Sequence, residues 1–469
     1  RMSKNKSYFF GGIGGSGMLP LANIVRDGGA QVAGSDRALD QGRLSPKFEW
    51  LKSLGIDIFP QDGSGLKSAD QILVASAAVE DSVPDVAKAK ELGCARMTRA
   101  ELLAELFNAA PRSVAVGGTS GKSTVTGMIG WILTDAGLDP TIMNGGVMKN
   151  FVSDGTPFAS ARVGHGGVFV SEVDESDGSI ALFRPEVAVL NNISLDHKSL
   201  DELRQLFGDF ARTAKRAVWN ADDIESVALL APMNLGDAIS FGFTDRADVR
   251  AVDVVEMPLA SRFTLKANGQ SWPVTLQVPG RHNISNALAA IAAALALDVP
   301  LAQAVHGVGR FAGLARRFDI VGIAGGITVI DDFGHNPDKT AATLATLKAF
   351  PGRVIAFFQP HGYGPIRVMG SELAAVFAKH LNRDDHLILC DPVYFGGTVD
   401  KSLGSQSITD AVVAAGKQAE YIPSREECGN RIVELAQSGD RIVIMGARDD
   451  TLSAFAADLL ARLVKASVA

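Results

Sequence analysis

The sequence predicts an α/β protein of three consecutive domains, each built around a largely parallel sheet. Short apolar runs alternate with helix-like segments along the whole chain. Two glycine-rich loops each follow an apolar run and open a helix-like stretch. The length of 469 residues exceeds what a single ordinary core supports and suggests about three domains.

The predicted domains span residues 1–110, 111–314 and 315–469. The first contains the strand-like runs SYFF, QVAGSD and ILVASAAV and the helical stretch TRAELLAELF. The second begins with SVAV, continues with GGVFVSEV, VAVLNNI and AVWN, and contains the alanine-rich helix NISNALAAIAAALAL. The third contains ITVIDDF, RVIAFFQ, HLILCD and RIVIMGA, again separated by helices.

Composition excludes several classes of protein. The formal net charge of -7 means that basic residues are not in excess, so we expect no nucleic-acid partner. No apolar run approaches the roughly 20 residues that cross a bilayer, so we expect no membrane segment. The three cysteines are scattered without a CxxC pair, which is typical of reduced thiols in the cytoplasm. We therefore expect a cytoplasmic protein, monomeric or dimeric.

The first glycine loop runs from Gly12 to Gly17 and reads GIGGSG. It follows a predicted strand and precedes a helix, and Asp36 ends the next strand. This pattern predicts a pyrophosphate at the loop and a ribose hydroxyl on the acid, as in dinucleotide sites. The alternative is a tight turn that binds nothing. The ligand need not be NAD, because every nucleotide diphosphate carries the same pyrophosphate.

The second loop, GGTSGKST at 117–124, lacks one residue of the usual phosphate-loop spacing, and Val116 stands where its first glycine belongs. Even so, the backbone amides of Thr119 to Lys122 can wrap phosphate oxygens, and Lys122 supplies a point charge. The hydroxyl of Ser123 can bind Mg²⁺. We expect ATP with Mg²⁺ at this loop.

Carboxylates follow two predicted strands. Glu172, Asp174, Glu175 and Asp177 stand in SEVDESD, directly after an apolar run, and Asp196-His197 follows another. Ligands in α/β sheets bind at the carboxyl ends of strands, so these side chains are candidate metal ligands. Solvated surface acids and a structural histidine are the alternatives.

Together these motifs resemble the Mur ligase family, the ATP-dependent amide ligases of peptidoglycan precursor synthesis and cell-wall biogenesis. That family's phosphate loop is Gly-Thr-x-Gly-Lys-Thr/Ser, which Gly118 to Ser123 match. Further marks follow in order: DESD at 174–177, NISLDH at 192–197, NADD at 220–223, PGRHNISNALAA at 279–290, ARRF at 315–318, DDFGHNP at 331–337 and GARDD at 446–450. The resemblance covers nearly the whole chain and is strongest to the branch that joins L-alanine to UDP-N-acetylmuramate, or to its relative that recycles murein tripeptide.

The resemblance implies a Rossmann-like domain for a UDP-N-acetylmuramate-type nucleotide sugar, a central P-loop ATPase domain, and a C-terminal Rossmann-like domain for a small amino acid. It also implies that ATP phosphorylates a carboxylate and that an amine attacks the acyl phosphate. The implied substrate-binding residues of the first domain are Gly14, Gly15, Ser16, Gly17, Met18, Ser35, Asp36 and Ser76.

For ATP, the resemblance implies a set of nucleotide-binding residues: Gly118, Thr119, Ser120, Gly121, Lys122, Ser123, Thr124, Asn283, Asn286, Arg317 and Asp332. Lys122, Glu175, His197 and Arg317 are the implied catalytic residues, and Ser123, Glu175 and His197 the implied metal ligands. Helix capping is the alternative for the two asparagines, and a surface ion pair for Arg317. No carbamylated lysine is expected, because no lysine lies between Lys198 and Lys215.

The residues expected to bind the amine substrate differ from those of the L-alanine branch. This chain has Phe333 and Asn336 where that branch has a tyrosine and a histidine. It has Gly362 and Pro365 where the branch has two arginines, which would bind a carboxylate. His335, His361, Tyr363 and Arg367 are the remaining candidates for the amine substrate, with a packed loop as the alternative. L-alanine is the predicted amine; another amino acid, murein tripeptide or a different carboxylate substrate is the alternative.

Two functions of other classes would use only part of these residues. An NAD-dependent oxidoreductase would use the first glycine loop and Asp36 but would leave Lys122 and the DESD run without a role. A catalytically idle homologue would be expected to lack Lys122, Glu175 or His197, and all three are present. The ATP-dependent acid–amino-acid ligase accounts for all of these residues.

Overall fold

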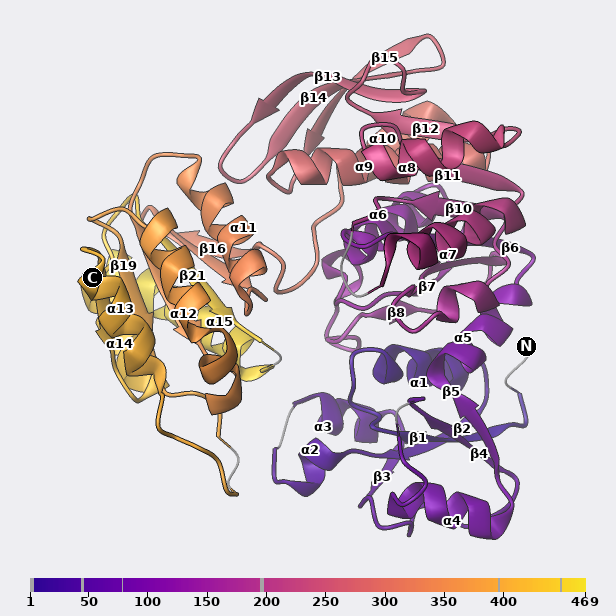
Figure 1. The fold of residues 1–469 in the computed structure, drawn as a ribbon, viewed down its shortest axis with the longest axis horizontal. Helices are drawn as coiled ribbons and strands as arrows, with labels where there is room; N and C mark the ends of the chain where they lie inside the picture. Colours follow the sequence, from indigo (N-terminus) through magenta and orange to yellow (C-terminus); the bar gives the residue numbers. More distant parts are fainter. Residues whose placement is uncertain (1–3, 44–45, 78, 195–197, 395–396, 448) are drawn as a thin grey trace. The chain divides into compact units, whose positions relative to one another are not determined.

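The computed structural model describes residues 4–43, 46–77, 79–194, 198–394, 397–447 and 449–469. Three sheets follow one another along the chain, each with helices packed against it (Figure 1). The predicted fold class, three consecutive α/β domains, is confirmed. By its internal contacts the chain forms two compact units, residues 1–314 and 315–469.

The N-terminal sheet has five parallel strands in the order β3-β2-β1-β4-β5. Its strands are β1 (Ser7–Gly11), β2 (Gln31–Ser35), β3 (Asp57–Phe59), β4 (Gln71–Ala75) and β5 (Ala95–Thr98). Its helices are α1 (Met18–Asp27), α2 (Arg37–Asp40), α3 (Pro46–Ser53), α4 (Pro84–Leu92) and α5 (Arg99–Asn108). The strand order reverses between β1 and β4, which is where open α/β sheets bind ligands.

The central sheet has ten strands in the order β15-β14-β13-β12-β11-β10-β6-β9-β7-β8. They are β6 (Arg112–Gly117), β7 (Thr141–Met143), β8 (Ala161–Arg162), β9 (Val168–Glu172), β10 (Val187–Leu190), β11 (Arg216–Asn220), β12 (Ile239–Gly242), β13 (Val249–Glu256), β14 (Ser261–Ala267) and β15 (Gln270–Leu276). The helices are α6 (Lys122–Asp135), α7 (Leu200–Thr213), α8 (Ile224–Leu230), α9 (Arg281–Ala296) and α10 (Leu301–Val308), with short 3₁₀ turns η1 (Lys149–Phe151), η2 (Ser179–Leu182) and η3 (Ala231–Met233). The strand that carries the second glycine loop, β6, lies between β9 and β10 and is parallel to both.

The antiparallel end of this sheet was not predicted. Strands β13, β14 and β15 pair antiparallel and extend the sheet at the end of this unit away from the N-terminal sheet (Figure 1). The turn between β14 and β15 is Asn268-Gly269, and both residues have positive φ, of 51° and 72°. That pair is a strong hairpin signal, and β14 alternates buried and exposed residues as a one-faced strand does.

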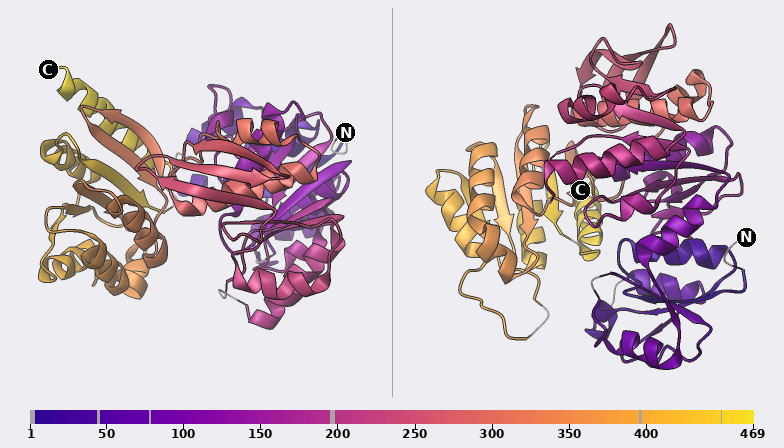
Figure 2. Two further views of the ribbon diagram at one scale, coloured as in Figure 1. Left: turned by 90° about the horizontal axis from the view of Figure 1, so that it is seen from above. Right: turned by 45° about the vertical axis from the view of Figure 1, so that its right-hand side comes forward.

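The C-terminal sheet has the order β16-β17-β21-β18-β19-β20, parallel except for the edge pair β16–β17. Its strands are β16 (Asp319–Ala324), β17 (Ile327–Asp332), β18 (Val354–Gln359), β19 (His386–Leu389), β20 (Gln418–Tyr421) and β21 (Arg441–Gly446). Its helices are α11 (Pro337–Lys348), α12 (Tyr363–His380), α13 (Ser405–Ala414), α14 (Arg425–Leu435) and α15 (Thr451–Ser467). Helices cover both faces of this sheet (Figure 2), so β17, β18 and β21 are buried along their whole length.

The N-terminal and central sheets share one hydrophobic core. Helix α5 lies between them (Figure 1), and its Phe107 stands edge-on to Phe169 of β9 and to Phe183, at centroid distances of 5.6 and 5.3 Å. Trp50 of α3 adds a hydrogen bond from Nε1 to the Gly155 carbonyl at 3.0 Å. Residues 1–110 therefore have their own sheet and a smaller core of their own around Phe9 and Leu73, but they share their larger core with the central sheet. Their predicted status as a domain stays a prediction.

No helix in the described part of the chain combines the length and apolar character that a membrane crossing requires.

Candidate active site

The first glycine loop joins β1 to α1 at the carboxyl edge of the N-terminal sheet. The Gly14 N–H donates to Asp36 Oδ2 at 2.8 Å, and the Ala38 N–H donates to Asp36 Oδ1 at 2.9 Å. A Cβ at Gly14 would lie 2.8 Å from the same carboxylate, so glycine is required for this close approach. Asp36 therefore shapes the loop in this structure, and its predicted contact with a ribose stays a prediction.

Three residues of this loop and one of the neighbouring strand lie at the surface. Gly15 and Ser16 are exposed and Gly17 is half-buried, while Ser76 is exposed just after β4. Because β1 and β4 are adjacent, these residues share the edge of the sheet at which the strand order reverses. The arrangement leaves the loop open to a ligand.

Two other predicted ligand residues lie inside the domain. Ser35 is fully buried and its Oγ donates to Asp85 Oδ2 at 2.7 Å, while Met18, at the start of α1, packs in the core. Burial raises the pKa of Asp85, which the bonds from Ser35 and the Gly63 N–H partly offset. In this structure the Ser35 hydroxyl bonds to the buried Asp85, and the predicted ligand contacts of Ser35 and Met18 stay predictions.

The second glycine loop joins β6 to α6, which begins at Lys122. Gly121 has a φ of 79°, and a Cβ there would lie 2.6 Å from Asn191 Nδ2 and 2.8 Å from Asn286 Oδ1. Both the backbone conformation and the space therefore demand glycine. This brings the loop amides to the amino end of α6, where the helix dipole favours a phosphate. Thr124 follows in the first turn of the helix.

Asn192 occupies the amides of the loop in this structure. Its Oδ1 accepts from Thr119 N at 3.0 Å, Ser120 N at 2.9 Å and Thr119 Oγ1 at 2.9 Å. Its Nδ2 donates to Ser120 Oγ at 2.9 Å. A side-chain oxygen that accepts from consecutive loop amides makes the contacts that a phosphate oxygen would make. Asn192 was part of the NISLDH motif, but the motif indicated no role for it.

Two carboxylates face the loop, and each has a different partner. Lys122 Nζ lies 3.2 Å from Glu175 Oε2, and the two side chains are 21% and 10% exposed. Ser123 Oγ donates to Glu172 Oε2 at 2.6 Å. Glu172 is the last residue of β9, the strand next to β6, which is where phosphate-loop proteins place a magnesium-binding acid. Glu172 was one of the four acids that the sequence offered as metal ligands, whereas the family resemblance implied Glu175; its place at the end of the strand is the signal that favours Glu172.

Asp174 also belongs to this cluster. Burial raises its pKa, but the hydrogen bonds from Ser176 and the charges of Lys122 and Arg99 outweigh burial and lower it below its usual value. Asp174 therefore stays ionised and adds negative charge beside Lys122.

A single cavity of about 260 Å³ connects the two glycine loops. Ser16 and Gly17 of the first loop line it together with Lys122 of the second. The other polar residues that line it are Arg99, Glu172, Asp174 and Ser179. A ligand held by the first loop and a phosphate held by the second can meet here.

The predicted metal ligands stay a prediction. Among the described residues, no three His, Cys, Asp or Glu side chains come together as metal ligands. His197 lies outside the described residues. Ser123 and Glu172 supply the hydroxyl and carboxylate oxygens that Mg²⁺ takes beside substrate phosphates and water, so this pair fits the ion.

The two asparagines at the start of α9 lie behind the loop. Asn286 Oδ1 accepts from Asn191 Nδ2 at 3.1 Å, and Asn286 Nδ2 donates to Asn283 Oδ1 at 3.3 Å. Asn283 Nδ2 donates to the Pro279 carbonyl at 2.8 Å. Neither side chain caps the helix, which begins after Gly280 without a side-chain cap.

The predicted ATP residues of the C-terminal unit differ in exposure. Arg317 is exposed, whereas Asp332 is buried. The Asp332 carboxylate accepts from the Phe318 and Gly334 amides at 2.8 and 2.9 Å and from Thr343 Oγ1 at 2.8 Å. Asp332 thus holds the carboxyl end of β17 in this structure, and its predicted contact with ATP stays a prediction.

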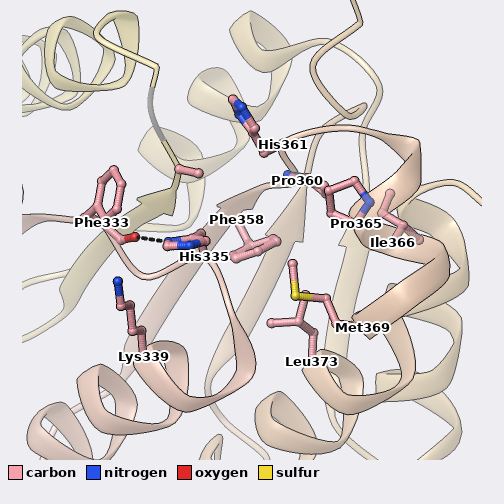
Figure 3. A pocket seen from close by; sticks show the side chains of 11 residues that line it. Phe333, His335, Lys339, Phe358, Pro360, His361, Pro365, Ile366, Met369 and Leu373 are labelled. Atoms are coloured by element: carbon pink, nitrogen blue, oxygen red, sulfur yellow. Dashed lines mark hydrogen bonds between the residues drawn. The ribbon is translucent and has the colours of Figure 1, made fainter. Parts of the chain in front are cut away.

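Of the four candidate residues for the amine substrate, all in the C-terminal unit, only two line the same cavity. His335 and His361 line a cavity of about 350 Å³ (Figure 3), and His335 Nδ1 lies 3.0 Å from the Phe333 carbonyl oxygen. Arg367 donates instead to the Asp400 carbonyl at 2.7 Å, and Tyr363 stands edge-on to Tyr394. Neither Arg367 nor Tyr363 lines the cavity, so the structure does not bring all four candidates together.

Comparison with known proteins places this geometry in a family. Sequence models described as "Mur ligase family, catalytic domain", "Mur ligase middle domain" and "Mur ligase, glutamate ligase domain" match residues 8–110, 116–294 and 316–448. The UDP-N-acetylmuramate–L-alanine ligase of Sulfurihydrogenibium sp. is 34% identical over 454 residues, 95% of each chain. That of Pelobacter propionicus is 35% identical over 457 residues, again 95% of each chain.

The chain belongs to the Mur ligase family.

Solved structures agree with this membership. The UDP-N-acetylmuramate-alanine ligase of Thermotoga maritima has a TM-score of 0.78 at 25% identity and covers 98% of this chain and 99% of its own. A murein peptide ligase of Psychrobacter arcticus has a TM-score of 0.69 at 25% identity, with the same coverage. As a Mur ligase, the chain is an ATP-dependent ligase of peptidoglycan precursor synthesis, and the predictions of family and enzyme class are confirmed.

Proposed function

We propose that this Mur ligase joins an amino acid, with L-alanine as the first candidate, to the carboxylate of UDP-N-acetylmuramate, using ATP and Mg²⁺. The observation that supports it is the cavity lined by Ser16 and Gly17 on one side and Lys122 on the other. The relatives named above share this reaction in their names and align over nearly the full chain. Cytoplasmic location and a monomeric or dimeric state belong to the same proposal.

The first glycine loop holds the pyrophosphate of the UDP-sugar in this proposal. Its backbone approaches closely because Gly14, Gly15 and Gly17 carry no side chains, and Asp36 keeps the loop in shape. The carboxylate of the sugar then extends into the shared cavity, where Arg99 and Lys122 offer positive charge. Attraction to these two cations offsets the repulsion between that carboxylate and the phosphates of ATP.

ATP lies along the second loop. The amides of Gly118 to Thr124 hold its phosphates once Asn192 has withdrawn, and Lys122 contacts the β- and γ-phosphates. We place Mg²⁺ at Ser123 and Glu172, because Ser123 bonds to Glu172 whereas Glu175 pairs with Lys122. When bound, Mg²⁺ neutralises charge on the phosphates that approach the carboxylate.

Four further roles belong to the proposal on the strength of the family resemblance. Asn283 and Asn286 face the adenine, Asp332 the ATP ribose, and Arg317 the γ-phosphate. His197, outside the described residues, keeps its proposed place at a second Mg²⁺.

The chemistry follows from the weakness of a carboxylate as an electrophile. A carboxylate oxygen attacks the γ-phosphorus, ADP leaves, and Lys122 stabilises the charge that moves to the leaving phosphate. The neutral amine then attacks the carbonyl carbon of the acyl phosphate. The tetrahedral intermediate loses one proton from its nitrogen to water, collapses to the amide and expels inorganic phosphate, which carries one oxygen of the original carboxylate.

Isotope transfer tests this proposal. UDP-N-acetylmuramate labelled with ¹⁸O in its carboxylate is incubated with the full chain, ATP, Mg²⁺ and L-alanine, and the released phosphate is analysed by mass spectrometry. One ¹⁸O per phosphate is expected. Release of unlabelled phosphate would overturn the acyl-phosphate route, and release that does not depend on the UDP-sugar would overturn the carboxylate substrate.

A further inference from the structure

The cavity in the C-terminal unit has a deep apolar wall. It measures about 350 Å³ and is lined by Phe358, Pro360, Pro365, Ile366, Met369 and Leu373 (Figure 3). Phe358 lies on the central strand β18, and Leu373 lies on α12, and both are almost fully buried. The wall is therefore built on regular elements of the core and not on a loop.

The size of this cavity exceeds what the side chain of alanine fills. An apolar cavity of roughly 150 Å³ holds a six-carbon ring. Ile366 and Leu373 are almost fully buried and Met369 is half-buried, so the methyl group of L-alanine would leave most of the space beside Met369 to water. A larger apolar side chain would replace that water and gain the free energy of removing its own apolar surface from solvent.

Two polar side chains of the cavity lie beside Phe333. Lys339, in the first turn of α11, and His335 line it there, whereas His361 lines it from the loop before α12, apart from them (Figure 3). The ammonium group of Lys339 and the imidazole of His335 can bind the carboxylate of an amino acid. On α12, by contrast, Pro365 has no backbone N–H to donate. A polar head at Lys339 and His335 and an apolar side chain against α12 fit the distribution of these groups.

We propose that this cavity accepts amino acids with apolar side chains larger than a methyl group, of the size of leucine, methionine or phenylalanine, and that the enzyme uses them with a lower KM than L-alanine. The proposal rests on the ligase activity proposed above and specifies its amine. Each buried methylene contributes about a fourfold gain in binding, so the three extra carbons of leucine set an upper limit of about sixtyfold. Ordering the side chain reduces this gain, and we expect at least about a tenfold lower KM for L-leucine.

Phosphate release tests the order of the amines. The full chain is assayed with ATP, Mg²⁺ and UDP-N-acetylmuramate against L-alanine, L-valine, L-leucine, L-methionine and L-phenylalanine. Met369→Trp fills the cavity from α12, and Val368→Trp is its matched control, because Val368 lies next to it on the helix and is 83% exposed. We expect Met369→Trp to raise the KM for L-leucine about tenfold, to change that for L-alanine little, and Val368→Trp to change neither.

A binding measurement separates this proposal from the ligase activity. Saturation-transfer NMR reports contact of free L-leucine or L-alanine with the full chain without turnover. Leucine contact that Met369→Trp abolishes and Val368→Trp retains supports the cavity assignment, even if no amine releases phosphate, in which case the proposed function alone fails. Turnover with L-alanine together with no binding or turnover of L-leucine overturns this proposal and leaves the function intact.

Discussion

Replacing Lys122 should damage both the fold and the reaction, and the two losses can be separated. Its ammonium lies 3.2 Å from Glu175, and both side chains are largely shielded from water. Lys122→Met leaves a nearly buried carboxylate without its partner, which costs about 1–2 kcal/mol once the remaining solvent exposure is allowed for. At about 2–4 °C per kcal/mol, the melting temperature of the first unit should fall by about 2–8 °C.

The double variant Lys122→Met, Glu175→Gln removes the unpaired charge. Its melting temperature, measured by calorimetry, should return to within about 2 °C of the unaltered chain. Phosphate release should stay reduced by at least about a hundredfold in both variants, because no uncharged side chain replaces the cation at the phosphates. Recovery of activity in the double variant would refute the reasoning, since Lys122 would then serve only to neutralise Glu175.

A matched lysine in the other unit provides the control. Lys348 Nζ lies 3.0 Å from Asp385 Oδ2, and the Asp385 side chain is fully buried. Lys348→Met should therefore destabilise the C-terminal unit at least as much as Lys122→Met destabilises the first. It should leave kcat close to that of the unaltered chain, because Lys348 lies in none of the cavities that the proposed reaction uses.

Three further variants test single residues. Asn192→Ala removes the internal acceptor from the loop amides and should tighten ATP binding by about threefold to tenfold in calorimetric titration; weaker binding would mean that Asn192 holds the loop in its binding form. Glu172→Gln should raise the Mg²⁺ concentration for half-maximal phosphate release by about tenfold. An unchanged Mg²⁺ dependence would mean that Glu175, and not Glu172, is the metal ligand. Asp36→Ala should raise the KM for UDP-N-acetylmuramate by about tenfold and spare that for ATP. Equal effects on both substrates would assign Asp36 to the fold alone.

Buried parallel strands were the most predictable part of the fold. The runs ITVIDD and RIVIMG each have a mainly apolar centre because helices cover both faces of their sheet, and the structure places β17 and β21 at these residues. Strands β13 to β15 were missed because each has one exposed face, which dilutes the apolar signal. The Asn268-Gly269 turn was the local signal that could have indicated them.

The loops of the site were predictable and the partners of their residues were not. A glycine loop between a strand and a helix has few possible geometries, so GGTSGKST identified the phosphate loop at the start of α6. Which acid of SEVDESD meets Ser123 depends on how the chain turns after β9, and only the structure distinguishes Glu172 from Glu175. In the C-terminal unit, the direction of Arg367 toward Asp400 depends on a tertiary contact that spacing along the chain does not encode.

The core that residues 1–110 share with the central sheet has a consequence for building chimeric ligases. Phe107 packs on Phe169 and Phe183, so helix α5 of the first domain also supports the strand that ends at Glu172. Transplanting the first sheet from another ligase would expose both halves of this interface and require them to be redesigned together. Residues 315–469 have their own core on both faces of their sheet. An exchange at 314/315 therefore offers the simpler route to a ligase with a new amine.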